Sequence, residues 1–228
     1  MNIVYLHRKN LINAGDFWST PYHYYGQNGA VLDILSAPVR LSDVDLMIIG
    51  GGGIIEPHTL GRLQEWISAT NPRKKVIWGA GSNRTLYGHD FFEQFDLVGL
   101  RNNKSPYEFI PCVSCMHELL DTPVSNSGGI LTVGHNKRPL PNQIHNQHVP
   151  IELSTRNISI ASAVITTSYH IYYWSRLMGK AVHMAVDKPL PSWSKGIADK
   201  YYTIPEEIDL DKFRDINNRF AEKVFNLI

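Results

Sequence analysis

Residues 163–184 constrain the fold of this chain more than any other stretch. They read as a short buried strand, a polar turn, a helix ended by glycine and a further strand (residues 163–166, 167–169, 170–179 and 181–184). This order is typical of an open parallel α/β sheet, whose ligands bind beyond the carboxyl ends of the strands. The amino end of such a helix favours an anion. His170, placed there, can hold a phosphate or move a proton.

The rest of the chain continues this alternation of strand and helix. Apolar, strand-like runs occupy residues 2–6, 45–49, 75–78, 96–100 and 130–134. Helical spacing of apolar residues occurs at 58–69, near 154–162 and over the amphipathic stretch 206–227. Strands that are apolar along their whole length are typical of a parallel sheet covered on both faces.

A turn-rich stretch at residues 121–129 divides the chain into two parts. We therefore predict an α/β protein of two Rossmann-like halves with a cleft between them, the second half being the more compact. The first half would span residues 1–122 and the second 129–228, with the last helix free to pack back on the first. A chain of 228 residues is long enough for two such domains.

Charge and hydropathy exclude some classes of partner. With 22 basic and 21 acidic residues the net charge is +1, which gives no electrostatic basis for binding nucleic acid. No apolar run approaches the ~20 residues of a membrane span, and the first residues lack a signal-peptide pattern. We expect a cytoplasmic protein, with or without a peripheral place at the inner membrane, whose oligomeric state the sequence leaves open.

Cys112 and Cys115 form a C-x-x-C pair, a spacing that occurs in redox sites and zinc sites. The sequence has no second cysteine pair, and a thioredoxin-like strand and helix start do not surround this one. Structural thiols are the simplest interpretation, with a redox role or a metal site that includes His117 as the alternatives. We expect neither a metal nor a cofactor.

Glycine-rich or polar turns follow the predicted strands of the first half. Four glycines at residues 50–53 exceed what a plain turn requires, which favours a loop that faces a ligand. They match neither a P-loop nor a dinucleotide fingerprint. Asp16, after the first strand, is either the cap of the next helix or a carboxylate that binds or activates a hydroxyl. Arg101, at the end of its strand, is either a surface arginine or part of the same edge.

One strand end of the second half carries a cluster of basic side chains. His135, Lys137 and Arg138 follow the strand at 130–134. Together with a helix amino end, two or three cationic groups suit a small, highly charged anion.

Taken in order, these motifs resemble those of the polysaccharide pyruvyl transferase family. The matching segments are Asn13-x-Gly15-Asp16, Asp45-x-x-Ile48-Ile49-Gly50-Gly51-Gly52, Gly79-x-Gly81-Ser82, Arg101 with Ser105, and His170 with the helix leading to Gly179-Lys180-Ala181-Val182. The resemblance implies a GT-B-like pair of Rossmann domains. It also implies transfer of a pyruvyl group from phosphoenolpyruvate to two hydroxyls of a sugar in a capsule or exopolysaccharide. The product would be a cyclic pyruvate ketal, with release of phosphate.

The chain departs from the family at two positions and is shorter than typical members. Ser168 stands where the family's Arg-x-His motif has its arginine, and Asn102 replaces the acidic residue that usually follows Arg101. Phosphoenolpyruvate carries a carboxylate and a phosphate, so at least two cationic contacts are expected. We assign donor binding to the polar turn, the arginine of the first half and the cationic cluster (Ser168, Tyr169, Arg101, Lys137 and Arg138). Arg156 and Arg176 are further candidate cations.

The resemblance also implies roles for individual side chains. His170 would be the general acid or would hold the leaving phosphate, and Asp16 or His135 would be the base on the sugar side. The acceptor would lie at the glycine-rich edge of the first half (Asn13, Gly15, Gly51, Gly52, Gly53, Gly81, Ser82 and Arg84). The acceptor sugar stays open among hexoses, N-acetyl sugars and keto-sugar acids such as Kdo.

Two other classes of function remain open, because a fold does not fix a function. A GT-B-type glycosyltransferase would need an acidic residue for the ribose of a sugar nucleotide, for which Glu206 or Glu207 could serve. A non-catalytic saccharide-binding relative is the third class, suggested by the arginine that Ser168 replaces.

Overall fold

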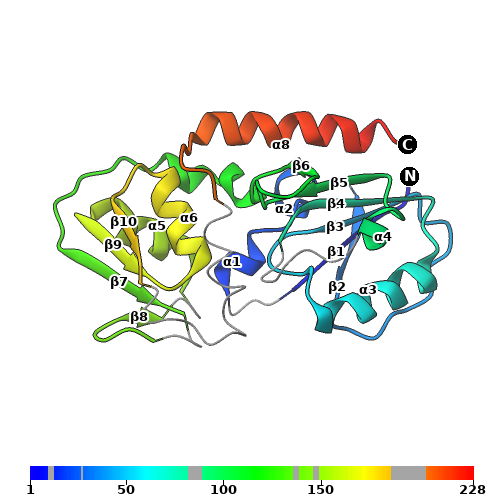
Figure 1. The fold of residues 1–228 in the computed structure, drawn as a ribbon, viewed down its shortest axis with the longest axis horizontal. Helices are drawn as coiled ribbons and strands as arrows, with labels where there is room; N and C mark the ends of the chain where they lie inside the picture. The colour runs from blue at the N-terminus through cyan, green and yellow to red at the C-terminus, as the bar shows by residue number, and fades with distance from the viewer. Residues whose placement is uncertain (10–12, 27, 82–88, 136–138, 146–148, 186–203) are drawn as a thin grey trace.

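The computed structural model describes residues 1–9, 13–26, 28–81, 89–135, 139–145, 149–185 and 204–228. Its strands form two separate sheets, and every strand pairing in both is parallel. Figure 1 shows the larger sheet on one side, the smaller sheet on the other, and the helix α8 running along the top. The chain therefore has a Rossmann-like α/β architecture, as the strand and helix alternation predicts.

The first sheet has six strands in the order β2-β1-β3-β4-β5-β6. Their bounds are Ile3–His7 (β1), Gly29–Asp33 (β2), Leu46–Gly50 (β3), Lys74–Ala80 (β4), Leu97–Leu100 (β5) and Glu108–Phe109 (β6). The helices of this half are Ala14–Phe17 (α1), Tyr22–Tyr25 (α2), Pro57–Thr70 (α3) and His89–Phe92 (α4). Because neighbouring strands run in parallel, their carboxyl ends meet at one edge of the sheet, and the glycine-rich turns follow at this edge.

The second sheet has four strands in the order β10-β9-β7-β8. They are Ile130–Gly134 (β7), Ile144–His145 (β8), Ala163–Thr166 (β9) and Val182–Met184 (β10), with the helices Ile151–Ile160 (α5) and Tyr169–Leu177 (α6). Between the two sheets the chain forms two short 3₁₀ helices, Val113–Met116 (η1) and Glu118–Asp121 (η2). Cys112 and Cys115 contribute to the buried core of the second half.

The alternation of side chains along each strand gives the first sheet two apolar faces. Val4 and Leu6 of β1 face the core that contains Leu63 and Trp66 of α3. The intervening Tyr5 faces the opposite core. That second core is covered by α8 (Leu210–Phe225), which contributes Phe220, Ala221 and Val224.

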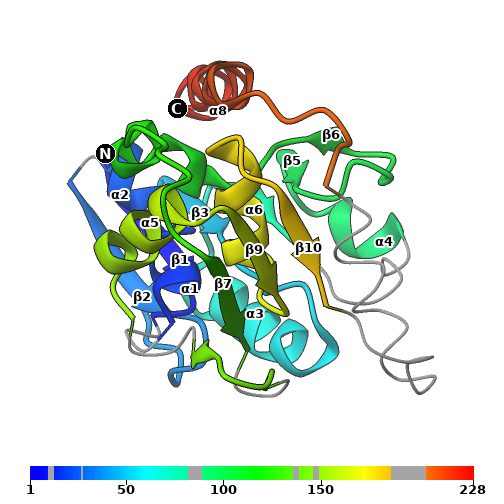
Figure 2. The same ribbon diagram turned by 90° about the vertical axis from the view of Figure 1, so that its left-hand side faces the viewer.

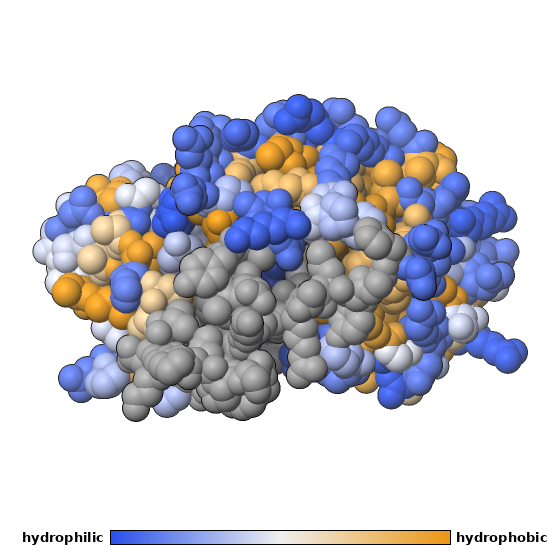
Figure 3. Space-filling view, in the orientation of Figure 1, coloured by the Kyte–Doolittle hydropathy of each residue, from blue (hydrophilic) through white to orange (hydrophobic). Residues whose placement is uncertain are grey.

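Helix α8 contacts both halves. Its first part buries Phe213 in the core of the second half, whereas its later turns pack on the six-stranded sheet. Between these regions the buried Asn217 accepts a hydrogen bond from Trp78 Nε1 (2.9 Å) and donates to the carbonyl of Pro111 (3.3 Å). In Figure 3 the outer side of α8, along the top, is hydrophilic and apolar residues lie beneath it.

The observed boundaries differ from the predicted ones where capping residues decide them. The last helix begins at Leu210 rather than at residue 206, because the Asp209 side chain accepts a hydrogen bond from Lys212 N and caps it there. Helix α5 begins three residues before the predicted start, directly after Pro150. The sequence patterns also missed β2, β6 and β8, two of which have only two residues.

No helix in the described ranges is both long and apolar enough to cross a membrane.

Candidate functional site

The short helix α1 lies between the two sheets (Figure 1). Figure 2 turns the second half, with the smaller sheet, toward the viewer. Helix α1 follows β1 of the first half, yet its first residue Ala14 and its C-cap residue Trp18 pack against the core of the second half. The carboxyl edge of the first sheet is thereby brought against the turn that follows β9. Most of the predicted site residues that the structure describes lie at this junction.

Asn13, and not Asp16, caps α1. The Asn13 side chain accepts a hydrogen bond from Gly15 N (3.1 Å), and its amide nitrogen donates to Asp16 Oδ2 (3.2 Å). The capping role considered for Asp16 is therefore wrong, because Asp16 lies inside the helix. Its other oxygen, Oδ1, would be 3.2 Å from a Cβ at Gly52, a residue with φ of +66°. The Asp16 carboxylate thus lies directly against the glycine turn after β3.

His170 lies against the same helix from the other half of the molecule. It belongs to the first turn of α6 and is only 7% exposed. A side chain at Gly15 would overlap the imidazole ring on its Nδ1 side, so the close approach of α1 and α6 requires glycine there. On the other side of the ring, Nε2 lies 3.6 Å from Cys112 Sγ. Asp16 and His170 therefore flank Gly15 from two different halves.

Arg101 is buried at the end of β5 and is not a surface arginine. It is 3% exposed, and its guanidinium carbon lies 4.1 Å from the centre of the Tyr169 ring. Its Nε lies so close to Gly81 that a side chain at this position would overlap it. Both terminal nitrogens, Nη1 and Nη2, are buried without a hydrogen-bond partner in the part of the chain that the structure describes. Stacking against Tyr169 joins the arginine of the first half to the amino end of α6.

The turn after β9 is tied to the end of β7 by hydroxyl groups. Thr166 Oγ1 donates to the carbonyl of Val133 (2.6 Å) and accepts from Ser168 N (2.9 Å). Thr167 Oγ1 accepts from His135 N (2.8 Å). Ser168 is the N-cap residue of α6 and is buried. His135 thus lies at the same edge as the polar turn, as predicted from the strand order.

Four of the predicted site residues lie outside the described residues, namely Ser82, Arg84, Lys137 and Arg138. The two further arginines considered for the donor are placed elsewhere. Arg156 is exposed on α5. Arg176, in the last turn of α6, donates to the Tyr172 hydroxyl (3.0 Å) and to the carbonyl of Glu206. It lies at the opposite end of the helix from His170.

The remaining predicted glycines shape the turn after β3. Gly51 has φ of +85°, and a Cβ there would overlap the backbone of Ser19. Gly53 is partly buried beside Gly52. These glycines let the turn approach α1 and the residues that follow it.

Both cysteines are buried and free. Burial raises the pKa of the Cys115 thiol to about 12, so this group is not a thiolate near neutral pH. Within the described ranges, no three or more His, Cys, Asp or Glu side chains gather as a metal site would require. The contact between Cys112 and His170 is a feature that sequence reasoning missed, because 58 residues separate the two.

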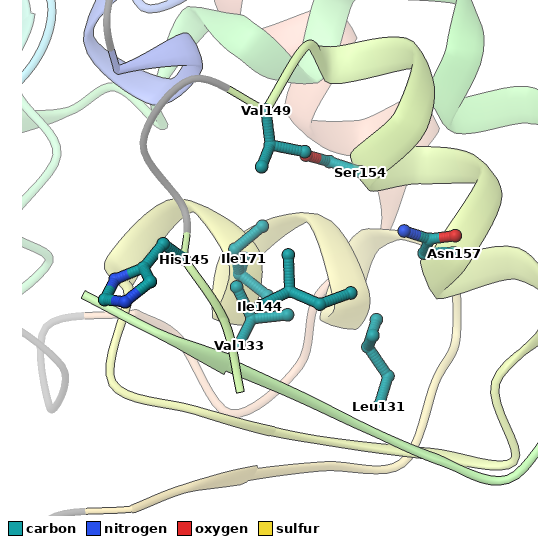
Figure 4. A pocket seen from close by; sticks show the side chains of 8 residues that line it. All are labelled: Leu131, Val133, Ile144, His145, Val149, Ser154, Asn157 and Ile171. Atoms are coloured by element: carbon teal, nitrogen blue, oxygen red, sulfur yellow. The ribbon is translucent and has the colours of Figure 1, made fainter. Parts of the chain in front are cut away.

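A small hollow with a cavity volume of about 10 Å³ lies within the second half and is distinct from the junction. Apolar side chains of β7, β8 and α6 line it, with Ser154 and Asn157 of α5 at one side (Figure 4). Among the described residues that line it, His145 alone carries ring nitrogens and none is a lysine or an arginine, so these residues do not supply the cationic lining that a small, highly charged anion requires.

Comparison with known proteins supports the fold alone. A crystal structure of a functionally uncharacterized protein from Klebsiella pneumoniae subsp. pneumoniae NTUH-K2044 is similar, with a TM-score of 0.51 and 16% sequence identity. The similarity covers 91% of this chain and 92% of that one. No protein-family model matches the sequence, and no curated protein matches it. The chain is thus similar in its whole architecture to another α/β protein whose printed description gives no function.

Proposed function

We propose that this protein transfers the pyruvyl group of phosphoenolpyruvate to two hydroxyls of a glycan, with Arg101 as a main donor-binding residue. The observation that carries the proposal is the buried guanidinium whose two terminal nitrogens have no partner in the described structure. An arginine keeps its charge under all ordinary conditions, and a buried unpaired charge is costly. An anionic ligand that binds these nitrogens removes this cost.

The chemistry around Arg101 fits a donor with two anionic groups. The Tyr169 ring covers one face of the guanidinium, so its free N–H groups point within its plane. A planar carboxylate matches such a fork with two parallel hydrogen bonds. The amino end of α6, which begins at Tyr169, favours a phosphate. Carboxylate on Arg101 and phosphate at α6 would place the reacting carbon of the donor next to His170.

Arg101 would share the donor with the cations expected in the second half. Arg101 belongs to the first half, whereas Lys137 and Arg138 follow β7 of the second. A donor held by both groups would lie between the two sheets, the arrangement of GT-B-like enzymes. The glycan would then approach along the glycine turns of the first half, next to Asp16. Because phosphoenolpyruvate is a metabolite of the cytoplasm, the reaction would take place there.

The reaction needs one proton donor and one proton acceptor. The imidazolium form of His170 would protonate the methylene carbon of the donor, which leaves an oxocarbenium-like centre at C2 and a neutral imidazole. A sugar hydroxyl adds to C2 and gives its proton to Asp16, or to His135 at the same edge. The second hydroxyl then displaces phosphate from C2 and closes the ketal, and its proton leaves with the phosphate. The hydrogen bond from Asn13 holds the Asp16 carboxylate in place for the first of these additions.

The structure gives less support to the two other classes of function. Glu206 and Glu207, the residues considered for the ribose of a sugar nucleotide, are exposed, and the Glu206 carbonyl already binds Arg176. A purely saccharide-binding protein would not need a buried arginine whose terminal nitrogens lack partners among the described residues.

Calorimetric titration with phosphoenolpyruvate tests the donor site without knowledge of the acceptor. The intact protein should bind phosphoenolpyruvate, and Arg101→Met should lose this binding while Arg214→Met keeps it. A parallel titration with UDP-glucose tests binding of a sugar nucleotide. Binding of UDP-glucose but not of phosphoenolpyruvate would overturn the proposal in favour of glycosyl transfer. The protein is then incubated with phosphoenolpyruvate and glycans bearing galactose, mannose, N-acetyl sugars or Kdo. Measurement of released phosphate and of the glycan mass identifies the acceptor.

A further inference from the structure

Three side chains form a continuous chain of polar contacts behind His170. Trp174 Nε1 donates a hydrogen bond to Ser114 Oγ (3.0 Å). Ser114 Oγ lies 3.2 Å from Cys112 Sγ, and Cys112 Sγ lies 3.6 Å from His170 Nε2. Ser114 and Cys112 come from the segment at η1, whereas Trp174 and His170 lie one helical turn apart on α6. The chain of contacts thus begins and ends on the same helix.

The hydrogen-bonding chemistry of these groups gives the chain a direction. An indole N–H can only donate, so Ser114 Oγ must accept from Trp174. The hydroxyl hydrogen of Ser114 is then available to the Cys112 sulfur, which leaves the thiol hydrogen for His170 Nε2. We infer that Cys112 is a positioning residue that makes Nε2 of His170 a hydrogen-bond acceptor, so that the neutral imidazole carries its proton on Nδ1.

The surroundings of these groups keep water away from the chain of contacts. Cys112 and Ser114 are 0% exposed, and Trp174 is 1% exposed. The backbone of Cys112 is held as well, because the Tyr173 hydroxyl donates to its carbonyl (3.0 Å). No water molecule can therefore replace the thiol as the partner of Nε2 without a rearrangement of the core.

The inferred tautomer determines which nitrogen of the neutral His170 ring can donate a hydrogen bond to a ligand. Nδ1 is the nitrogen that lies against Gly15 of α1, the helix that also carries Asp16. The proton on Nδ1 therefore faces the first half of the protein and the proposed acid–base site. The hydrogen bond that one ring nitrogen makes commonly sets the role of the other in this way. This consequence for the reaction rests on the proposed function, whereas the tautomer itself does not.

Nitrogen NMR of the unliganded protein tests the tautomer directly. The protein is labelled with [¹⁵N]histidine, and the His170 resonances are identified by their loss in His170→Gln. At about pH 8, above the ordinary histidine pKa, we expect proton coupling at Nδ1 and a non-protonated shift at Nε2. A proton on Nε2 would overturn the inference. This result is independent of whether phosphoenolpyruvate is a substrate.

Variants of Cys112 test its positioning role. Cys112→Ser retains a hydroxyl donor and should keep the Nδ1–H form, whereas Cys112→Val lacks a donor and should shift protonation towards Nε2. Cys115→Val is the matched control, because this second buried thiol contacts Asn217 instead of His170. An unchanged tautomer in Cys112→Val would contradict the inference.

Kinetics then separate positioning from a packing effect. Cys112→Val should lower kcat for ketal formation roughly 10–100-fold, by analogy with the loss of partners that orient metal-bound imidazoles. The KM for phosphoenolpyruvate should change little. Cys112→Ser should restore most of kcat. Equal losses in Cys112→Val and Cys115→Val would show that only packing is at work. If the tautomer shifts as expected but phosphoenolpyruvate is not consumed, the proposed function fails and the positioning role stands.

Discussion

Arg101 and Arg214 are two partly or fully buried arginines that differ in what they bind. Arg214 of α8 binds both carboxylate oxygens of Asp121 at 2.8 Å and donates to the carbonyls of Cys115 (3.0 Å) and His117 (3.4 Å). Arg101 at the end of β5 is more deeply buried, yet its two terminal nitrogens have no partner within the described ranges.

The difference separates an arginine that holds the fold together from one that serves a ligand. The donors of Arg214 are satisfied by the chain itself, on a helix that contacts both halves. The fork of Arg101 is positioned by Tyr169 and Gly81, two neighbours that fix its plane without using its terminal N–H groups. A geometry fixed in advance lowers the cost of binding. The comparison therefore predicts that replacing Arg101 weakens ligand binding, whereas replacing Arg214 lowers the free energy of unfolding.

The largest effect should come from the imidazole next to Arg101. We expect His170→Gln to lower kcat for ketal formation by ~10²–10⁴, the usual loss when a general acid is removed. His145→Gln, an exposed histidine of the same half, should leave kcat unchanged. Stopped assays of phosphate release measure both variants. A normal kcat in His170→Gln would show that His170 is not the general acid of the reaction.

Replacing Arg101 should weaken binding of the donor without lowering the stability of the fold. Charge-assisted hydrogen bonds contribute ~1.5–3 kcal/mol each, so Arg101→Met should raise the KM for phosphoenolpyruvate by roughly 100-fold or more. Its free energy of unfolding should stay the same or rise, because an unpaired buried charge is removed. The KM for the glycan should change much less. A clear loss of stability in urea unfolding would instead place Arg101 in the same class as Arg214.

His7 sharpens the comparison, because a buried histidine can lose its charge and an arginine cannot. Burial at the end of β1 lowers the pKa of His7 from 6.5 to about 4, against a smaller opposing effect of its hydrogen bond to the Arg8 carbonyl. Between these two values the unfolded chain binds a proton that the folded protein does not. Stability should therefore fall by up to about 3 kcal/mol as the pH falls from 6.5 to 4.

Urea unfolding at several pH values checks this expectation. His7→Gln should flatten the slope between pH 6.5 and 4, whereas His183→Gln, an exposed histidine on β10, should not. Burial also lowers the pKa of His23 and of His117, so a shallower slope of the same sign should remain. An unchanged slope in His7→Gln would show that His7 is charged in the folded protein.

The smallest effect should follow from replacing Arg214. Arg214→Met removes its hydrogen bonds to two backbone carbonyls and to a half-exposed carboxylate, and we expect the free energy of unfolding to fall by about 1–2 kcal/mol. Binding of phosphoenolpyruvate should be unaltered. A parallel loss of phosphoenolpyruvate binding would remove the contrast between the two arginines.

Much of the fold could be predicted because the strands of both sheets are apolar and end at glycine or polar residues. β7 and β9 have the predicted bounds, and β3 and β5 differ by one residue. β2 could not be predicted, because as an edge strand it is only partly buried and lacks an apolar run. The start of α8 depends on a single capping hydrogen bond, which the amphipathic pattern does not reveal.

The site was less predictable, because its main contacts join residues far apart in the chain. The strand order brought Arg101 and His170 to the right edges, but not the stacking of Arg101 on Tyr169 or the approach of His170 to Gly15. The glycines could be seen in the sequence, but the contacts that require them could not. Gly15, Gly52 and Gly81 each leave room for a charged or titratable side chain from elsewhere. The expected donor cations Lys137 and Arg138 stay a prediction.

The way α8 covers the first sheet has a consequence for how the protein is made. Ile3, Tyr5 and Trp78 leave the ribosome early, but the residues that cover them, Phe220 and Val224, follow more than 140 residues after Trp78 is made. One apolar face of the first sheet therefore stays bare throughout most of synthesis. Until α8 arrives, the nascent chain presents a surface for chaperones and for other unfinished chains. The yield of folded protein during synthesis should thus depend on the last helix, α8.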